Sequence, residues 1–152
     1  MISIPLFWGV VLRHGQMPSS EEVSQAEREH IDRLAVAAVM EAEHGLGHEP
    51  REMPHEHPGY DIESRDPAAS RLRFIEVKGK AVGATTVTIS KTQIFTALNK
   101  PDDFILAIVE VDGDTAREPR YIRRPFQREP DFGVTSVNYD LAELLARGEK
   151  PS

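Results

Sequence analysis

Residues 59–80, G-Y-D-I-E-S-R-D-P-A-A-S-R-L-R-F-I-E-V-K-G-K, decide the fold that we expect for this chain. They predict two short strands, one carrying Asp61 and the other carrying Glu76 and Lys78, joined by a polar loop that contains a proline. Because side chains alternate between the two faces of a strand, Glu76 and Lys78 point the same way. If the strands pair, Asp61 lies beside Glu76, so that two carboxylates and an ammonium converge at one sheet edge. The strands are expected over residues 60–63 and 72–78.

Two neighbouring carboxylates favour a divalent cation between them, because like charges at short range raise the pKa of one carboxyl group. Oxygen ligands of this kind suit Mg²⁺ or Mn²⁺. An ion held by Asp61 and Glu76 would polarise a phosphoryl oxygen, and Lys78 would orient the nucleophile or neutralise charge on the phosphate. The pattern therefore indicates phosphodiester hydrolysis. The alternative is an ordinary half-exposed strand on which E-V-K is a solvent-facing ion pair.

Five segments follow one another in an order that resembles a known family. They are V-M-E-A-E-H-G-L-G (39–47), G-Y-D-I (59–62), I-E-V-K-G (75–79), S-K-T-Q (90–93) and the apolar run 104–109. This order resembles the D…(D/E)xK core of the PD-(D/E)XK, or restriction-endonuclease-like, superfamily. More narrowly, it resembles a helicase-associated domain related to the C-terminal domain of the plant protein NO VEIN. The resemblance covers about residues 30–147.

The resemblance implies an α/β fold with an αβββαβ core, in which a mixed central sheet is flanked by helices. It implies a Mg²⁺- or Mn²⁺-dependent deoxyribonuclease in which Asp61 and Glu76 bind the metal, Glu43 is a supporting carboxylate and Lys78 positions water. Gln93 stands where the family often has glutamate, so we expect at most an auxiliary role for it. Because members of the superfamily can keep the fold and lose activity, a non-catalytic nucleic-acid-binding or regulatory module is the alternative.

The whole chain predicts one domain of 152 residues, with an N-terminal arm or strand (1–17), a core (18–112) and accessory elements (113–152). No apolar run is long enough to cross a membrane. The absence of cysteine excludes disulfides and thiolate metal sites and is typical of a reducing compartment, so we expect a cytoplasmic location. A third functional alternative is a protein-interaction domain that docks through residues 1–12.

The net charge of −7 is unevenly distributed. Residues 1–66 hold five basic and thirteen acidic residues, whereas residues 67–152 hold thirteen basic and twelve acidic ones. Nucleic-acid binding depends on local patches more than on net charge. A free domain with this net charge is nevertheless expected to bind DNA weakly unless a partner or tethered domain supplies the rest. The resemblance implies DNA, rather than RNA, as the substrate and a helicase or remodeller as that partner.

A long helix is predicted to begin at an N-cap, Ser19 or Ser20, and to end near Glu43 or His44 before two glycines. Its apolar stripe is formed by Ile31, Leu34, Ala35, Ala38 and Val39. Glu43 lies on or beside this stripe, so it can reach inward at the helix end. The alternative is a solvent-exposed glutamate at the C-terminus of the helix.

The segment 45–58 is predicted to be an exposed polar loop, although His44, His48, His55 and His57 invite a zinc interpretation. The segment has no H-E-x-x-H motif, and three prolines break any helix that would align the histidines. Further along, the sequence predicts a strand at 84–89, a helix from the N-cap Ser90 to about Asn99, a doubly buried strand at 104–111, an extended piece within 119–126 and a final helix at 141–147.

Basic residues supply the predicted nucleic-acid contacts. Lys80 and Lys91 can reach phosphate near the site, although solvated lysines are the common case. The arginines form either a phosphate-binding rim, with Tyr121 and Phe126 stacking on bases, or ion pairs with the acidic N-terminal helix. They are Arg117, Arg120, Arg123, Arg124 and Arg128, of which Arg120, Arg123 and Arg124 are the predicted nucleic-acid ligands.

Overall fold

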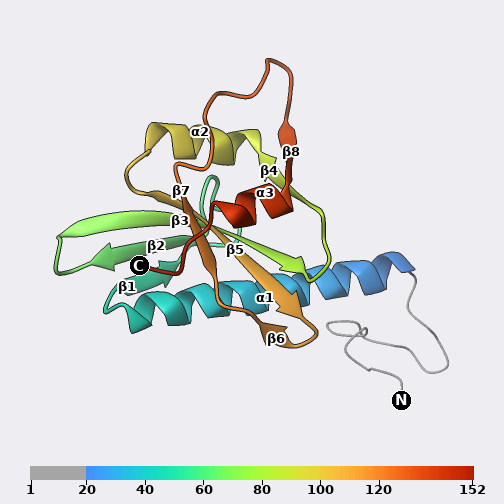
Figure 1. Ribbon diagram of the computed structural model, residues 1–152, viewed down its shortest axis with the longest axis horizontal. Coiled ribbons are helices and arrows are strands. Elements are labelled where there is room, and N and C mark those ends of the chain that lie inside the picture. Colours follow the sequence, from blue (N-terminus) through green and yellow to red (C-terminus); the bar gives the residue numbers. More distant parts are fainter. Residues whose placement is uncertain (1–19) are drawn as a thin grey trace.

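The computed structural model describes residues 20–152, with side chains from residue 24 onward, and is drawn in Figure 1. The arm predicted over residues 1–17 lies outside the described residues, as does the side chain of either candidate N-cap. The elements are α1 (Ser20–Gly45), β1 (Glu49–Glu52), β2 (Ile62–Asp66), β3 (Arg71–Ala81), β4 (Thr86–Ser90), α2 (Lys91–Asn99), β5 (Phe104–Asp112), β6 (Thr115–Ala116), β7 (Arg120–Arg123), β8 (Ser136–Asp140) and α3 (Leu141–Ala146).

The central sheet is mixed. Strands β1, β2 and β3 form an antiparallel meander, and β3 then pairs in parallel with β5 after the chain has passed through α2. Strand β5 also pairs with β6 and, along its first half, with β7. Its residues 104–109 are all buried, as the unbroken apolar run predicts for a strand covered on both faces.

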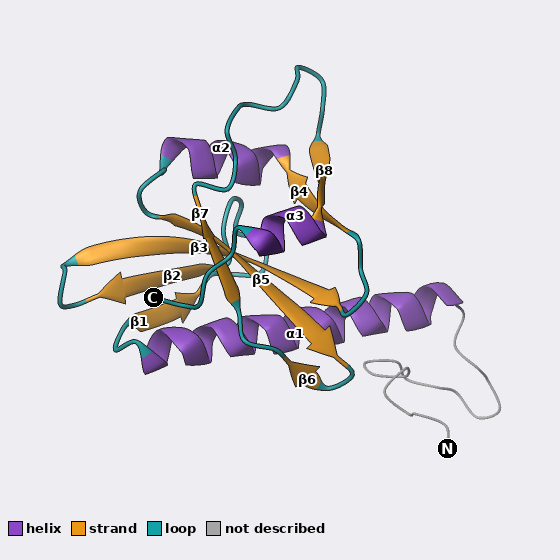
Figure 2. Ribbon diagram, in the orientation of Figure 1, coloured by secondary structure: helices purple, strands orange, loops and turns teal. Residues whose placement is uncertain are grey.

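Helices cover both faces of the sheet, as Figure 2 shows. The α1 stripe packs through Ala35 and Val39 on Ile75 and Val77, which point to one face of β3. The opposite face carries α2, α3 and the β4–β8 pair around Phe104 and a second set of apolar side chains. The predicted α/β class with a mixed sheet between helices is therefore confirmed.

The αβββ unit contains β1, β2 and β3. Strands β2 and β3 correspond to the strands predicted at 60–63 and 72–78, whereas β1 takes the place of the strand predicted at 84–89. Strand β1 lies in the segment predicted to be an exposed loop. Its sequence, E-P-R-E, has no apolar alternation because it is an edge strand that is largely exposed, where a proline is tolerated. The predicted strand at 84–89 does form, as β4, but it leaves the central sheet and pairs with β8, which the sequence analysis missed. Alternation shows that Val87 and Ile89 are buried, but not which strand is their partner.

Glycines stand at the two closest approaches around β3. A Cβ atom on Gly79 would lie 2.8 Å from the Cβ of Ala35 and 2.9 Å from a methyl group of Ile31, so glycine lets α1 pack against the strand. Gly59 has a φ of +95°, and a Cβ atom there would lie 2.5 Å from the hydroxyl oxygen of Thr96. Gly79 thus allows α1, and Gly59 allows α2, to lie close to the segment that carries Asp61, Glu76 and Lys78.

Candidate active site

Asp61 immediately precedes β2 and forms hydrogen bonds with the edge of β3 through both its backbone and its side chain. Its backbone N–H donates to the carbonyl of Ile75 at 2.9 Å, which extends the β2–β3 pairing by one residue. Its carboxylate oxygen Oδ2 accepts the backbone N–H of Val77 at 2.8 Å. Because β2 begins only at Ile62, the Asp61 side chain replaces the missing strand partner of Val77, and this fixes the carboxylate next to Glu76.

Glu76 points to the α2 face of β3 and is only 3% exposed. Its Oε2 accepts a hydrogen bond from the side-chain amide of Gln93 at 2.8 Å and lies 3.5 Å from the ammonium of Lys78. Burial and the negative charge of Asp61 raise the pKa of Glu76 from 4.5 to about 8, and the charge of Lys78 opposes the shift only in part. The predicted convergence of Asp61, Glu76 and Lys78 is therefore present in the fold.

Gln93 reaches this pair from the first turn of α2. The hydroxyl of Ser90 accepts the backbone N–H of Gln93 at 3.1 Å, and the Gln93 side-chain oxygen accepts the backbone N–H of Ser90 at 2.9 Å. This reciprocal capping box is the arrangement that the S-x-x-Q sequence predicts. It leaves the amide nitrogen of Gln93 free to donate to Glu76.

A cavity of about 300 Å³ opens beside the two carboxylates and is walled by α1, the end of β3 and the segment from Glu52 to His55. Asp32 of α1 lines it together with Asp61 and Glu76. Loss of hydration raises the pKa of Asp32, Lys78 lowers it and Asp61 raises it further. The sequence analysis missed Asp32. Asp32 could have been suspected from the sequence, because it directly follows Ile31 of the apolar stripe. An acidic residue at the border of such a stripe usually faces solvent, however, so the position alone does not indicate a site.

Glu43 does not join this site, so the structure contradicts its predicted role as a supporting carboxylate. Glu43 lies eleven residues beyond Asp32 on α1, which at 1.5 Å per residue is about 16 Å along the helix. It is completely buried and accepts hydrogen bonds from Tyr121 at 2.7 Å and from Arg73 at 2.8 Å, and it bonds to His48 at 3.0 Å. Burial raises its pKa, but these partners together lower it below its ordinary value. Glu43 thus holds a buried polar network together, and it is not the solvent-exposed glutamate of the alternative either.

The four histidines of the segment 44–57 do not form a metal site. His48 contacts Glu43 and lies 3.6 Å from Asp66, whereas a ring nitrogen of His57 lies 3.2 Å from the carbonyl of Tyr60. Across the described part of the chain, no group of three or more histidine or acidic side chains is arranged to hold a metal ion.

In the same part of the chain, no helix is long and apolar enough to cross a membrane.

Asp61 and Glu76 nevertheless fit Mg²⁺ or Mn²⁺ as a two-carboxylate site. Mg²⁺ in phosphate-processing sites is held by one or two carboxylates, and water and substrate oxygens complete its coordination. The open cavity beside the pair leaves space for those ligands. The raised pKa of Glu76 reflects first the burial of its charge and then the neighbouring charge of Asp61, and a divalent ion would offset both.

The predicted arginine ligands lie two strands away from β3, on and after β7, which is about 10 Å across the sheet. Arg120 donates to the carbonyl of Gly148 at 2.6 Å, Arg123 donates to that of Ser152 at 3.1 Å, and Arg124 pairs with Asp102. Arg117 lies 3.9 Å from Glu110. Among the described residues, none of these contact partners of the four arginines lies in α1, which counts against the alternative of ion pairs with the acidic helix.

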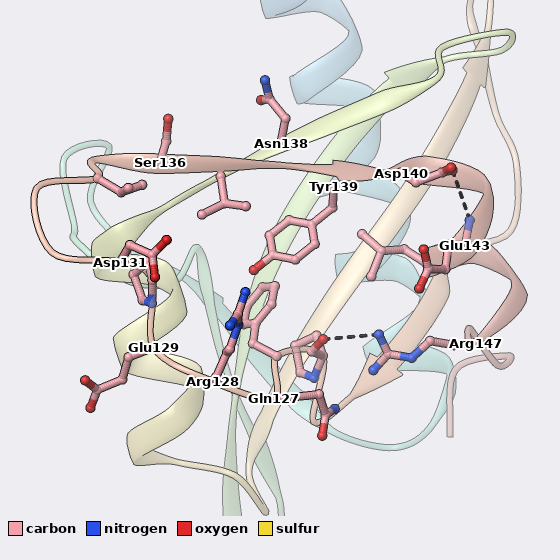
Figure 3. A pocket seen from close by; sticks show the side chains of 16 residues that line it. Gln127, Arg128, Glu129, Asp131, Ser136, Asn138, Tyr139, Asp140, Glu143 and Arg147 are labelled. Atoms are coloured by element: carbon pink, nitrogen blue, oxygen red, sulfur yellow. Dashed lines mark hydrogen bonds between the residues drawn. The ribbon is translucent and has the colours of Figure 1, made fainter.

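The two aromatic residues proposed for base stacking are also not available. Tyr121 is 2% exposed and Phe126 is 7% exposed, and both belong to the core. Phe126 packs against Tyr139 at the wall of a cavity of about 560 Å³ formed by the segment 125–131, β8 and α3. Figure 3 shows this cavity, with the Arg128 and Tyr139 side chains next to each other in it. It shares no lining residue with the cavity beside Asp61 and Glu76.

Lys91 lies on α2 with its ammonium 5.9 Å from the ring centroids of both Phe95 and Phe132. Phe132 is fully exposed. Lys80 follows Lys78 by two residues on β3 and therefore points to the same face. Of the predicted basic ligands, Lys80 is the one that lies on the same strand as Glu76.

Comparison with known proteins agrees with this architecture. The fold is similar to that of Hjc, a Holliday junction resolvase from the archaeal hyperthermophile Archaeoglobus fulgidus, with a TM-score of 0.50 and 11% sequence identity over 75% of this chain and 94% of that chain. No curated protein matches the sequence. The model of the family described as "Protein NO VEIN, C-terminal" matches residues 31–122, a segment that contains Asp61, Glu76, Lys78 and Gln93. The chain therefore belongs to the NO VEIN C-terminal family, and its fold is similar to that of the resolvase Hjc.

Proposed function

We propose that this domain is a metal-dependent nuclease that hydrolyses phosphodiester bonds in DNA. The observation that carries the proposal is the convergence of Asp61, Glu76 and Lys78 at one cavity, where Glu76 is buried and 3.5 Å from the Lys78 ammonium. Placing a second carboxylate, that of Asp61, beside the buried carboxylate of Glu76 is unfavourable in itself, so the arrangement calls for a function that uses it.

Each residue has a distinct role in this proposal. Asp61, fixed by the Val77 N–H, and Glu76, fixed by Gln93, would hold Mg²⁺. The ion would lower the pKa of a bound water and polarise the phosphoryl oxygen. The ammonium of Lys78 would orient the attacking water in line with the leaving oxygen and stabilise the charge that grows on the phosphate. Gln93 is a positioning residue, because it contacts Glu76 and not the substrate.

The choice of DNA as the substrate is supported by the fold neighbour Hjc, which is a Holliday junction resolvase. The expected association with a helicase or remodeller rests on the family resemblance and on the acidic net charge of −7, which disfavours DNA binding by the domain alone. We also propose a cytoplasmic location, because a chain without cysteine is typical of a reducing compartment.

The proposal is tested by titrating Mn²⁺ calorimetrically into the wild type and Asp61→Asn, and by measuring nicking of a supercoiled plasmid with Mn²⁺ or Mg²⁺. Asp61→Asn is expected to lose Mn²⁺ binding. Lys78→Met is expected to bind Mn²⁺ and to nick at least about 100-fold more slowly than the wild type. Glu110→Gln is the matched control, because Glu110 lies on the neighbouring strand β5 and its nearest cation, Arg117, is 3.9 Å away.

A non-catalytic nucleic-acid-binding module with the same fold is the second candidate. It is favoured by one observation, that Gln93 and Lys78 supply Glu76 with a hydrogen-bond donor and a positive charge, so that its carboxyl group has partners within the protein itself. This candidate predicts no heat of Mn²⁺ binding and no nicking by the wild type. That combination would replace the nuclease proposal.

A further inference from the structure

A second cavity continues from the candidate active site along α1. It measures about 410 Å³ and is walled by the first half of the described part of α1, the end of β3 and β4. Asp32, Lys78 and Gly79 line both cavities. The two cavities therefore adjoin where α1 crosses β3, next to the close approach at Gly79.

The two cavities differ in charge. The one beside Asp61 and Glu76 is also lined by Asp32 and Glu52, and among the described residues that line it Lys78 is the only lysine or arginine. The second cavity is lined by Arg28, Lys78 and Lys80 against two acids, Glu27 and Asp32. A polyanion is thus attracted to the second cavity directly, and to the first only through a bound cation.

Two of these cations are available to a ligand. Within the described residues the Lys80 side chain makes no hydrogen bond and no ion pair within 4 Å, although its charge acts on Asp32, and Lys80 is only partly exposed. Arg28 is held by a hydrogen bond of 2.8 Å from its guanidinium to the hydroxyl of Ser24, which also lines the cavity. This contact uses one of the five N–H donors of the guanidinium and directs the side chain along the cavity wall.

We propose that the second cavity binds the phosphate next to the scissile one, through Lys80 and Arg28, so that the substrate strand is held on one side of the cleavage point. The inference rests on the proposed nuclease function. Lys78 and Lys80 are two residues apart on the same face of β3, and so about 6.6 Å apart along the strand. That separation is comparable with the spacing of successive phosphates in an extended nucleic-acid strand, so Lys78 can serve the scissile phosphate while Lys80 contacts its neighbour.

The proposal defines the substrate class. A productive substrate is a polynucleotide strand that continues past the scissile bond into the second cavity. On the opposite side, the cavity wall from Glu52 to His55 offers no lysine or arginine in the described structure, so a strand that ends there loses little binding. A small phosphodiester that occupies only the first cavity gains nothing from Arg28 or Lys80.

The test compares Arg28→Ala/Lys80→Ala with Lys100→Ala/Lys150→Ala, a double variant that also removes two positive charges but at exposed positions outside both cavities. Binding of a fluorescent single-stranded oligonucleotide is measured by anisotropy with Ca²⁺ present, over a range of salt concentrations. Hydrolysis of the oligonucleotide and of bis(p-nitrophenyl) phosphate is measured with Mn²⁺. Thermal melting followed by circular dichroism verifies that each variant is folded.

The first variant is expected to bind the oligonucleotide at least about 10-fold more weakly than the wild type and to lose about one unit of salt slope per cation removed. Its KM for the oligonucleotide should rise by a larger factor than its KM for bis(p-nitrophenyl) phosphate, which occupies only the first cavity. The inference is overturned if oligonucleotide affinity and salt slope are unchanged, or if the control variant loses as much. Failure of the nuclease proposal is recognised separately, because the wild type would then hydrolyse neither substrate while the binding comparison still decides the role of the cavity.

Discussion

The side-chain amide of Gln93 donates a hydrogen bond of 2.8 Å to Glu76, and this bond joins the first turn of α2 to the central strand β3. The same side chain accepts the backbone N–H of Ser90 and so completes the helix cap. One residue therefore fixes both the start of α2 and the orientation of a buried carboxyl group. A glutamate in this position would place a third negative charge beside Asp61 and Glu76.

Replacing Gln93 with leucine tests this dual role. The variant leaves the Ser90 N–H without its side-chain acceptor and removes a hydrogen bond from a buried carboxyl group. We expect a loss of about 1–2 kcal/mol in the free energy of unfolding, measured by urea denaturation. Thr92→Ala is the control, because Thr92 is exposed on the same turn of α2. Equal losses in the two variants would show that the effect comes from helix propensity and not from these hydrogen bonds.

The raised pKa of Glu76 makes the stability of the metal-free protein depend on pH. Its pKa is about 8 in the folded protein, against 4.5 for an unperturbed group, so the folded state binds more protons between these values. The free energy of unfolding is therefore expected to fall as pH rises from about 4.5 to about 8. Urea denaturation in EDTA at several pH values measures this fall.

Glu76→Gln should remove the part of this pH dependence that comes from Glu76, and Glu110→Gln should keep it. Glu43 makes no contribution in the same range, because its lowered pKa affects stability only below about pH 4.5. If Glu76→Gln has the same slope as the wild type between pH 5 and 8, the assigned cause of the pKa shift is wrong.

The buried position of Glu43 predicts a structural role that is separable from metal binding. Glu43→Gln removes the charge that neutralises Arg73 and weakens the contacts with Tyr121 and His48. We expect a loss on the order of 2–4 kcal/mol in the free energy of unfolding, with Mn²⁺ affinity within twofold of the wild type. Glu41→Gln, at an exposed position on the same helix, is the control. A tenfold loss of Mn²⁺ affinity in folded Glu43→Gln would contradict this prediction and would mean that Glu43 contributes to metal binding.

The sequence was sufficient for the centre of the site and insufficient for its surroundings. Alternation along 72–78 placed Glu76 and Lys78 on one face, and pairing with the strand predicted at 60–63, which carried Asp61, placed Asp61 beside Glu76. Both inferences depend only on the two-residue period of a strand. The S-x-x-Q start of α2 was likewise predictable, because a capping box is a local structure.

The missing parts depend on tertiary packing. Helical spacing correctly predicted that Glu43 points inward, but spacing gives the face of a helix and not the point at which the helix crosses β3. That crossing lies at Ala35 and Gly79, so Asp32 reaches the cavity and Glu43 reaches Arg73 instead. Strand β1 was missed for a related reason, because an exposed edge strand has no apolar alternation to detect.

The crossing of α1 over β3 gives the last prediction. In Gly79→Ala, the new methyl group would lie 2.8 Å from the Cβ of Ala35, 2.9 Å from a methyl carbon of Ile31 and 3.0 Å from the Ile31 carbonyl oxygen. Two of the three nearest atoms are backbone or Cβ atoms that no side-chain rotation can move, so α1 must shift away from the sheet. We expect a loss of about 1–3 kcal/mol in the free energy of unfolding.

The same shift would move Asp32, which α1 carries into the cavity beside Asp61 and Glu76, so Mn²⁺ binding should weaken in folded Gly79→Ala. Gly45→Ala is the matched control, because no atom lies within 4 Å of a Cβ atom at that position and its φ is not positive. Its stability should equal or slightly exceed that of the wild type, since alanine has less conformational freedom to lose on folding. A Gly79→Ala variant as stable as Gly45→Ala would mean that α1 is not held against β3 as closely as this packing requires.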